Sequence, residues 1–275
     1  MIQFIHPDFI ILSAPRSGST WLQFLLNEHP DLYCAGELLS IHSPNCCLGR
    51  LMPTKFNRLH HTVNKLHRNS DLPWKRFTRV FNRTFGHTQN FVCSNKIHHL
   101  FEQGLMPTSQ KVDMNGFKLM RLHLKRFGIP LAQYLQGHCK NQVTLIRKNI
   151  LKRWVSLMVA KMKVNFSSFP NAKTGNKWKI PLNKMLIDLD EFRSAEKDLV
   201  QYNLGQKKIV ITYEDLLQKP DQTWFSLCDF FEIPRIQIPL SKTIKQNSDL
   251  LCEVVANYDQ MKSMILGTKY EVFLD

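Results

Sequence analysis

The sequence has no cysteine pair at a metal-binding or redox spacing and no long apolar run. Its seven cysteines are an odd number and form no Cys-x-x-Cys motif, so we expect neither a disulfide framework nor a metal site. No stretch approaches the roughly 20 apolar residues of a membrane-spanning helix. The first residues also lack the basic and apolar pattern of a secretory signal. These absences predict a cytoplasmic protein with reduced thiols and no membrane span.

The chain also lacks repeats, low-complexity segments and any linker that would divide it. Its 275 residues are 43% hydrophobic, which is enough for one large core and predicts a single domain over residues 1–275. The 37 Lys and Arg exceed the 22 Asp and Glu and give a net charge of +15, which favours an acidic partner. Because there is no zinc finger, aromatic RNA-binding motif or concentrated basic helix, we expect that partner not to be a nucleic acid.

Short apolar runs alternate with helical patterns along the chain. Each run has the length and continuity of a strand that is buried on both faces. The runs lie at 9–12, 32–34, 116–120, 142–146 and 208–213. Helical periodicity follows the first run, covers 149–162 and returns around 224–231. This alternation predicts an α/β fold of three layers, with a central parallel sheet flanked by helices. The irregular basic segment at about 42–110 is predicted to be an insertion that faces the substrate.

The first predicted strand and its helix are joined by the loop Ser13–Thr20, which reads SAPRSGST. A loop in this position offers the free N–H groups and the partial positive charge of a helix N-terminus to an anion. Gly18 allows the backbone to approach that anion closely. Ser17, Ser19 and Thr20 add hydroxyl donors, and Arg16 adds a permanent charge. The loop therefore predicts a P-loop-like phosphate site.

This loop is not the Walker A motif of nucleoside triphosphatases. That motif begins with glycine and ends in lysine followed by serine or threonine, whereas Ser13 and Ser19 occupy those glycine and lysine positions here. Without the lysine that reaches the β- and γ-phosphates, the loop favours a ligand that has no γ-phosphate. A P-loop-type small-molecule kinase is the alternative, and it would need ATP and Mg²⁺.

Two segments resemble those of PAPS-dependent sulfotransferases. The stretch 15–22, PRSGSTWL, is similar to their 5′-phosphosulfate loop, and the stretch 145–156, LIRKNILKRWVS, is similar to their 3′-phosphate site. In the second stretch Arg147 and Ser156 match the arginine and serine of the family. Their spacing of nine is more like that of the bacterial carbohydrate sulfotransferases of the trehalose and Nod-factor types. The resemblance implies sulfuryl transfer from PAPS to a hydroxyl, on a carbohydrate acceptor, with release of PAP and without a metal.

The resemblance also implies which residues bind the donor. They are Arg16, Ser17, Gly18, Ser19, Thr20, Trp21, Arg147, Ser156, Tyr213 and Lys245. Tyr213 opens a Tyr-Glu-Asp-Leu stretch that the family commonly has, and it either lies near the nucleotide or packs, with Glu214 and Asp215 capping a helix. Lys242 and Lys245 are candidates for covering the donor.

Glu37 is the candidate base, because carbohydrate sulfotransferases have a glutamate at the corresponding place. His42, His98 and His99 remain rivals, since the cytosolic enzymes of the family use a histidine. Arg16 stands where those enzymes have a lysine, so we expect it to stabilise charge on the leaving phosphate, which makes it catalytic as well as binding. A protein that binds PAP or a polyanion without catalysis stays open as an alternative.

Overall fold

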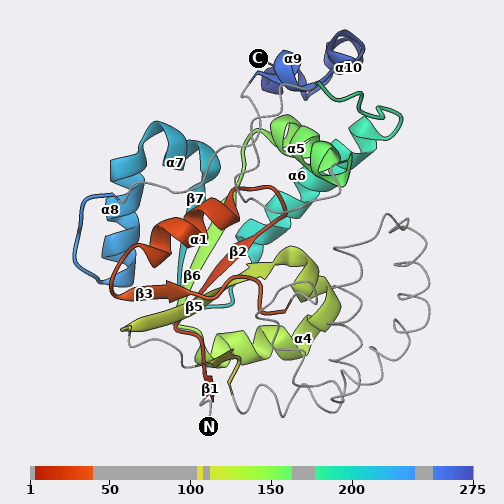
Figure 1. The fold of residues 1–275 in the computed structure, drawn as a ribbon. Coiled ribbons are helices and arrows are strands. Elements are labelled where there is room, and N and C mark those ends of the chain that lie inside the picture. Colours follow the sequence, from red (N-terminus) through yellow and green to blue (C-terminus); the bar gives the residue numbers. More distant parts are fainter. Residues whose placement is uncertain (1–3, 40–103, 108–111, 163–176, 239–249, 275) are drawn as a thin grey trace, which may run out of the picture.

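The structure, a computed structural model, describes residues 4–39, 104–107, 112–162, 177–238 and 250–274. Its centre is a five-stranded sheet in the order β3-β5-β2-β6-β7, and all four pairings are parallel (Figure 1). The strands are β2 Phe9–Ser13, β3 Leu32–Cys34, β5 Met114–Met120, β6 Asn141–Ile146 and β7 Lys207–Thr212. The predicted parallel sheet is thus confirmed.

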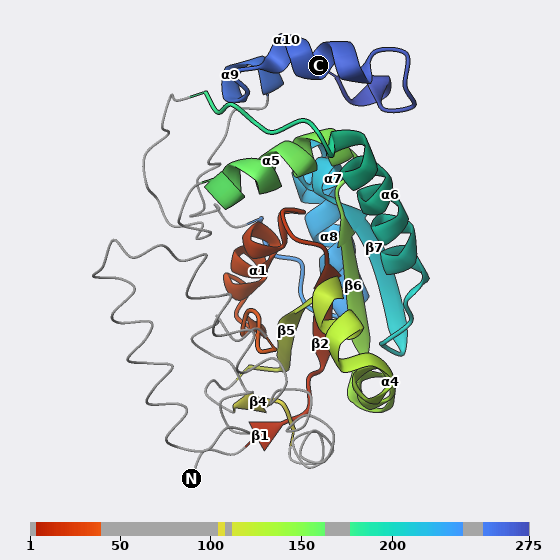
Figure 2. The same ribbon diagram turned by 90° about the vertical axis from the view of Figure 1, so that its right-hand side faces the viewer.

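Helices cover both faces of this sheet (Figure 2). One face is covered by α1 Ser19–Asn27 and α8 Pro220–Phe231. The other face is covered by α4 Arg121–His138 and α6 Met185–Gln201. The central strand β2 explains the arrangement, because Phe9 and Ile11 pack into one hydrophobic cluster while Ile10 and Leu12 pack into the other. All four side chains are fully buried, which is why this strand reads as a continuous apolar run. The predicted three layers are confirmed.

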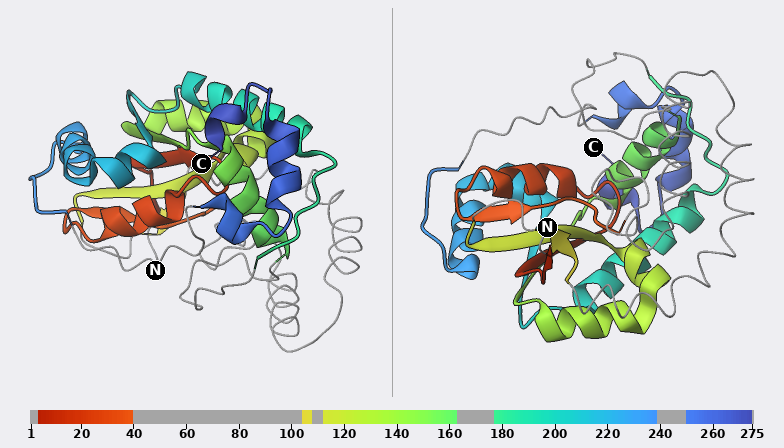
Figure 3. Two further views of the ribbon diagram at one scale, coloured as in Figure 1. Left: turned by 90° about the horizontal axis from the view of Figure 1, so that it is seen from above. Right: turned by 60° about the horizontal axis from the view of Figure 1, so that its bottom comes forward.

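A third hydrophobic cluster fixes helix α5 Ile150–Met162 across the end of the sheet. It joins α5 and α6 to the C-terminal elements, which Figures 2 and 3 show stacked on α5. These elements are α9 Leu251–Val254, α10 Tyr258–Ile265 and the 3₁₀ turn Glu271–Phe273. Within the cluster the buried indole of Trp154 donates through Nε1 to Asp188 at 2.9 Å. The orientation of α5 is therefore set from both sides.

The predicted strand at 208–213 is wrong by one residue at its end. Strand β7 stops at Thr212, and Tyr213 instead begins the short helix α7 Tyr213–Gln218. The cause is an N-cap, since the Thr212 hydroxyl oxygen accepts the Asp215 backbone N–H at 3.0 Å. Tyr213 therefore projects from a helix start rather than from the sheet.

Most of the predicted insertion at 42–110 lies outside the described residues. Its described part, 104–107, carries strand β4 Met106–Pro107, which pairs antiparallel with β1 Phe4–Ile5. Leu105 and Met106 are buried in the core there. Within the described ranges, no helix combines the length and the apolar character that crossing a bilayer would require.

Candidate active site

The predicted site residues follow strands whose carboxyl ends share one edge of the sheet. Ser13 of β2 is aligned with Met120 of β5 and with Leu145 of β6, and Ile146 is aligned with Thr212 of β7. The segments that follow these strands must therefore meet at this edge. In open parallel sheets ligands bind outside the carboxyl ends of the strands, so the register alone brings the predicted segments to one place.

The loop between β2 and α1 has an unusual backbone. Arg16 has φ of 64° and Gly18, the N-cap of α1, has φ of 91°. A left-handed conformation at a non-glycine residue costs about 1–3 kcal/mol and is concentrated at functional sites. Ser17 is fully buried, and its hydroxyl donates to the Ala14 carbonyl at 2.8 Å within the loop. A Cβ on Gly18 would lie 2.4 Å from Cδ2 of Tyr213. Both this close contact and the positive φ therefore require glycine at position 18.

The two segments that resemble phosphate sites are in direct contact. Arg16 donates through Nε to the Ser156 hydroxyl at 3.0 Å. A guanidinium nitrogen of Arg147 donates to the Arg16 carbonyl at 3.3 Å, across 131 residues of sequence. Burial in the first place, and the positive charge of Arg147 in the second, lower the pKa of Arg16. The charge of Arg147 is thus near enough to lower the pKa of Arg16, and an anion would be stabilised beside two such cations.

Tyr213 packs against both of these segments. Its ring centroid lies 4.6 Å from the guanidinium carbon of Arg147 and 5.9 Å from the ring of Trp21, which it meets edge to face. An arginine over a tyrosine ring is attracted by the ring's negative face. Tyr213 therefore links the loop, the start of α1 and the end of β6, which accords with the packing role left open by the sequence.

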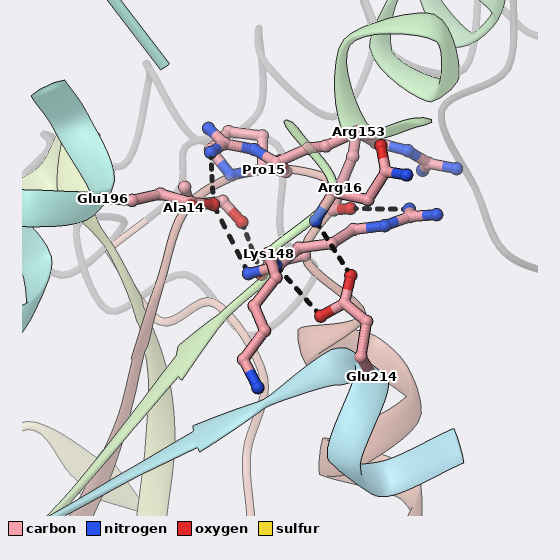
Figure 4. Close-up of polar contacts among 10 residues, drawn as sticks. Ala14, Pro15, Arg16, Lys148, Arg153, Glu196 and Glu214 are labelled. Atoms are coloured by element: carbon pink, nitrogen blue, oxygen red, sulfur yellow. Dashed lines mark hydrogen bonds and ion pairs between the residues drawn. The ribbon is translucent and has the colours of Figure 1, made fainter. Parts of the chain in front are cut away.

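Glu214 fixes the turn that follows β6 and that begins with Arg147. Its carboxylate accepts the backbone N–H groups of Lys148 at 2.9 Å and of Asn149 at 3.0 Å, as Figure 4 shows. Hydrogen bonds from two amides to one carboxylate are charge-assisted and stronger than neutral ones. The sequence indicated only a helix-capping role for Glu214, and the structure adds this contact with the turn after β6.

Lys118 is a site residue that sequence reasoning missed. It lies within β5 and is only 4% exposed. Its Nζ donates to the Thr20 hydroxyl at 3.0 Å and pairs with Oε1 of Glu37 at 3.1 Å. The sequence held a sign of this role, because Lys118 lies inside the apolar run 116–120, which was predicted to be a buried strand. A lysine is almost never fully buried unless it is paired. The lysine thus joins the start of α1 to the candidate base.

Glu37 is held beside Lys118 by the continuation of strand β3. Gly36 has φ of 81°, and its carbonyl accepts the Lys118 backbone N–H at 2.7 Å. One residue earlier, the Ala35 backbone N–H donates to the Gly116 carbonyl at 2.9 Å. These bonds extend the pairing of β3 with β5 as far as the glutamate, so the Glu37 backbone is anchored to the sheet.

A buried histidine also belongs to this part of the site. Burial lowers the pKa of His123 to about 4, against the opposing effect of the nearby Glu37 carboxylate. The imidazole is therefore neutral at pH 7. Its Nδ1 accepts the Met120 backbone N–H at 3.2 Å, which places the ring proton on Nε2. The rival bases His42, His98 and His99 lie outside the described residues, as do Lys242 and Lys245.

Comparison with known proteins agrees with this geometry. Residues 6–249 match the sulfotransferase domain family. The chain belongs to the sulfotransferase family. It is a sulfotransferase, an enzyme that transfers a sulfuryl group to a hydroxyl acceptor.

Individual relatives are more distant. The chain is 24% identical to Nodulation protein H from Rhizobium tropici over 97% of this chain and 92% of that protein. Among solved structures, a sulfotransferase from Alicyclobacillus acidocaldarius is 15% identical, covers 88% of this chain and 87% of its own, and has a TM-score of 0.44. The sulfotransferase domain from the curacin biosynthetic pathway is 17% identical, covers 99% of this chain and 90% of its own, and has a TM-score of 0.46.

Proposed function

We propose that this sulfotransferase uses PAPS as its donor and transfers the sulfuryl group to a carbohydrate hydroxyl. The observation that carries the donor assignment is the contact between the two cationic segments. Arg16 reaches Ser156, and Arg147 reaches the Arg16 carbonyl, which supports two proposed anion sites side by side. PAPS carries separate anionic groups on its 5′ and 3′ positions, and it matches a site of this kind.

In this proposal the loop Ser13–Thr20 and the N-terminus of α1 hold the 5′-phosphosulfate. The backbone N–H groups at the helix start and the guanidinium of Arg16 face the phosphate that leaves. The proposed binding site for the 5′-phosphosulfate also includes Ser19, Thr20 and Trp21. The buried Ser17 hydroxyl stabilises the loop by its hydrogen bond to the Ala14 carbonyl. Arg16 is catalytic here because negative charge grows on the bridging oxygen as the bond to sulfur breaks.

The 3′-phosphate is assigned to Arg147 and Ser156. The arginine can grip a phosphate with two parallel N–H groups, and the serine hydroxyl faces it from α5. The stacking of Tyr213 on Arg147 limits the directions in which the guanidinium can point. Lys245, which lies beyond the described residues, stays a proposed cover for the donor.

The acceptor side of the reaction is assigned to Glu37 and Lys118. The acceptor hydroxyl oxygen forms the new bond to sulfur while the bond from sulfur to the bridging phosphate oxygen breaks. The proton of the acceptor hydroxyl passes to the Glu37 carboxylate, and PAP departs. Lys118 orients that carboxylate through the 3.1 Å ion pair and supplies positive charge beside Thr20. Positioned acid–base groups of this kind contribute about 10²–10⁴-fold to rate.

Carbohydrate is favoured as the acceptor class for two reasons. The spacing between Arg147 and Ser156 resembles that of carbohydrate enzymes, and the chain matches Nodulation protein H along nearly its whole length. We further propose that residues 1–275 form one domain and that the segment at about 42–110 faces the acceptor.

Thermal unfolding with added nucleotides tests the donor assignment. PAP at 100 times its Kd should stabilise the fold by about 2.7 kcal/mol, whereas ATP with Mg²⁺ should give a much smaller shift. No shift with millimolar PAP would refute the assignment. Incubation with labelled PAPS and candidate oligosaccharides then tests the acceptor class, and label on a lipid or phenol but on no sugar would contradict it.

A further inference from the structure

An ion pair between α5 and α6 lies against the loop Ser13–Thr20, which is the proposed donor loop, and no role has yet been given to either of its residues. Arg153 of α5 is 3% exposed, and its guanidinium donates to Oε1 of Glu196 on α6 at 2.8 Å. Through Nε the same guanidinium donates to the Pro15 carbonyl at 3.1 Å. Figure 4 shows the Arg153 and Glu196 side chains together with Pro15. Arg153 thus binds the loop with one nitrogen and Glu196 with another.

Glu196 in turn binds the end of β6. The oxygen that receives Arg153 also accepts the Arg147 backbone N–H, at 3.3 Å. A chain of three hydrogen bonds therefore runs from Pro15 through Arg153 and Glu196 to the backbone of Arg147. These two ends are the residues that adjoin the proposed 5′ and 3′ anion sites.

We propose that Arg153 and Glu196 are positioning residues that fix the distance between the two anion sites. This inference rests on the proposed function, because it takes PAPS and PAP as ligands that use both sites at once. A ligand with two anionic groups binds more tightly than either half only when the two sites are held at the matching separation. The buried pair holds that separation, so it contributes to binding the bisphosphate without touching it.

Three features of the pair suit this role. Phe192 lies against the Arg153 guanidinium, with 4.2 Å from the guanidinium carbon to the ring centroid, so the arginine has little room to turn. The planar fork of arginine can also hold two acceptors at a fixed angle, which a lysine cannot do. The Arg153 side chain is 3% exposed and that of Glu196 is 12% exposed, so separating them would leave a largely desolvated charge without its partner.

The test compares three ligands by calorimetry at one ionic strength: PAP, 5′-AMP and 3′-AMP. In Glu196→Ala we expect the Kd of PAP to rise about tenfold, while the Kd of each monophosphate changes less than about twofold. Loss of a carboxylate makes the site more positive, which by itself would tighten all three ligands. A selective loss for PAP therefore cannot come from the change in charge. Glu191→Ala, at an exposed position on the same helix, is the matched control and should leave all three values unchanged.

Arg153→Lys gives a second reading that keeps the positive charge. It should lower the ratio of the 5′-AMP Kd to the PAP Kd in the same way. One ammonium group cannot replace both hydrogen bonds of the Arg153 guanidinium. If Glu196→Ala does not fold, the decision rests on this variant. An unchanged ratio of the 5′-AMP and PAP dissociation constants in a folded variant would overturn the inference. Wild-type protein that binds PAP no better than 5′-AMP would instead refute the proposed function.

Discussion

Replacing Gly18 by alanine tests whether the donor loop depends on its close contact with Tyr213. The new Cβ would lie 2.4 Å from Cδ2 of Tyr213, so the ring must move by about 1 Å to restore an ordinary contact of 3.4 Å. Alanine at φ of 91° also costs about 1–2 kcal/mol of backbone strain. The two effects differ in what they change, because strain lowers stability whereas a displaced ring disturbs Arg147.

The loss of ligand affinity can be estimated from that displacement. A partly desolvated arginine over an aromatic ring contributes about 1–2 kcal/mol, so loss of the stacking on Arg147 should weaken PAP binding by about 5- to 30-fold. The added methyl group also stands where the backbone would approach an anion, which acts in the same direction. Calorimetric titration with PAP measures the change, and urea denaturation measures the loss of stability.

Gly267→Ala separates the two effects. Gly267 has φ of 73°, and a Cβ there would meet nothing within 4 Å. This variant should therefore lose about 1–2 kcal/mol of stability from strain alone and bind PAP like the wild type. If Gly18→Ala also kept wild-type PAP affinity, the close contact with Tyr213 would have no part in donor binding.

Three further variants test the roles assigned to single residues. Arg16→Ala should lower kcat by about 10²-fold or more, measured with labelled PAPS, and a loss confined to donor affinity would remove its catalytic role. Lys118→Met should lower kcat with a much smaller change in the Kd of PAP, because the proposed base loses its orienting partner; loss of PAP affinity at unchanged turnover would contradict this. His123 should make the protein sensitive to acid. Its folded pKa of about 4 lies below the unfolded value of about 6.5, so stability falls as pH drops from about 6.5 towards 4. Between pH 7 and 4.5 the loss should be about 2.5 kcal/mol, measured by urea denaturation, and His123→Gln should lack it.

The strands, and the loop that joins β2 to α1, were predictable because their signals are local. A fully buried strand such as β2 must be apolar at every position, and a loop that binds an anion must expose N–H groups and small residues. Helix α4 gave no such signal, because a glycine and a proline, Gly128 and Pro130, interrupt its sequence. In the structure Gly128 is a non-helical kink, with φ of 56° and ψ of −140°. Helix α6 was also missed, since its buried side chains are few and widely spaced.

The supporting contacts could not be predicted, because each joins elements that are far apart in sequence. Lys118 finds Glu37 only through the register of β3 on β5. Arg153 finds Glu196 only through the packing of α5 on α6. A lysine in an apolar strand and an arginine on a buried helix face show that a partner must exist, but they do not say which carboxylate it is.

These pairings also refine what the net charge of +15 indicates. Lys118 and Arg153 are the two most deeply buried of the site's cations, and each lies against a carboxylate, Glu37 or Glu196. Their charges are therefore largely compensated within the protein, and they act by holding other groups in place. Arg16, in contrast, donates to a neutral hydroxyl and has its pKa lowered by burial and by Arg147. Since an anion beside Arg16 would relieve both effects, we expect the charge that attracts the proposed donor to lie in the loop, and the two compensated pairs to hold the groups around it in place.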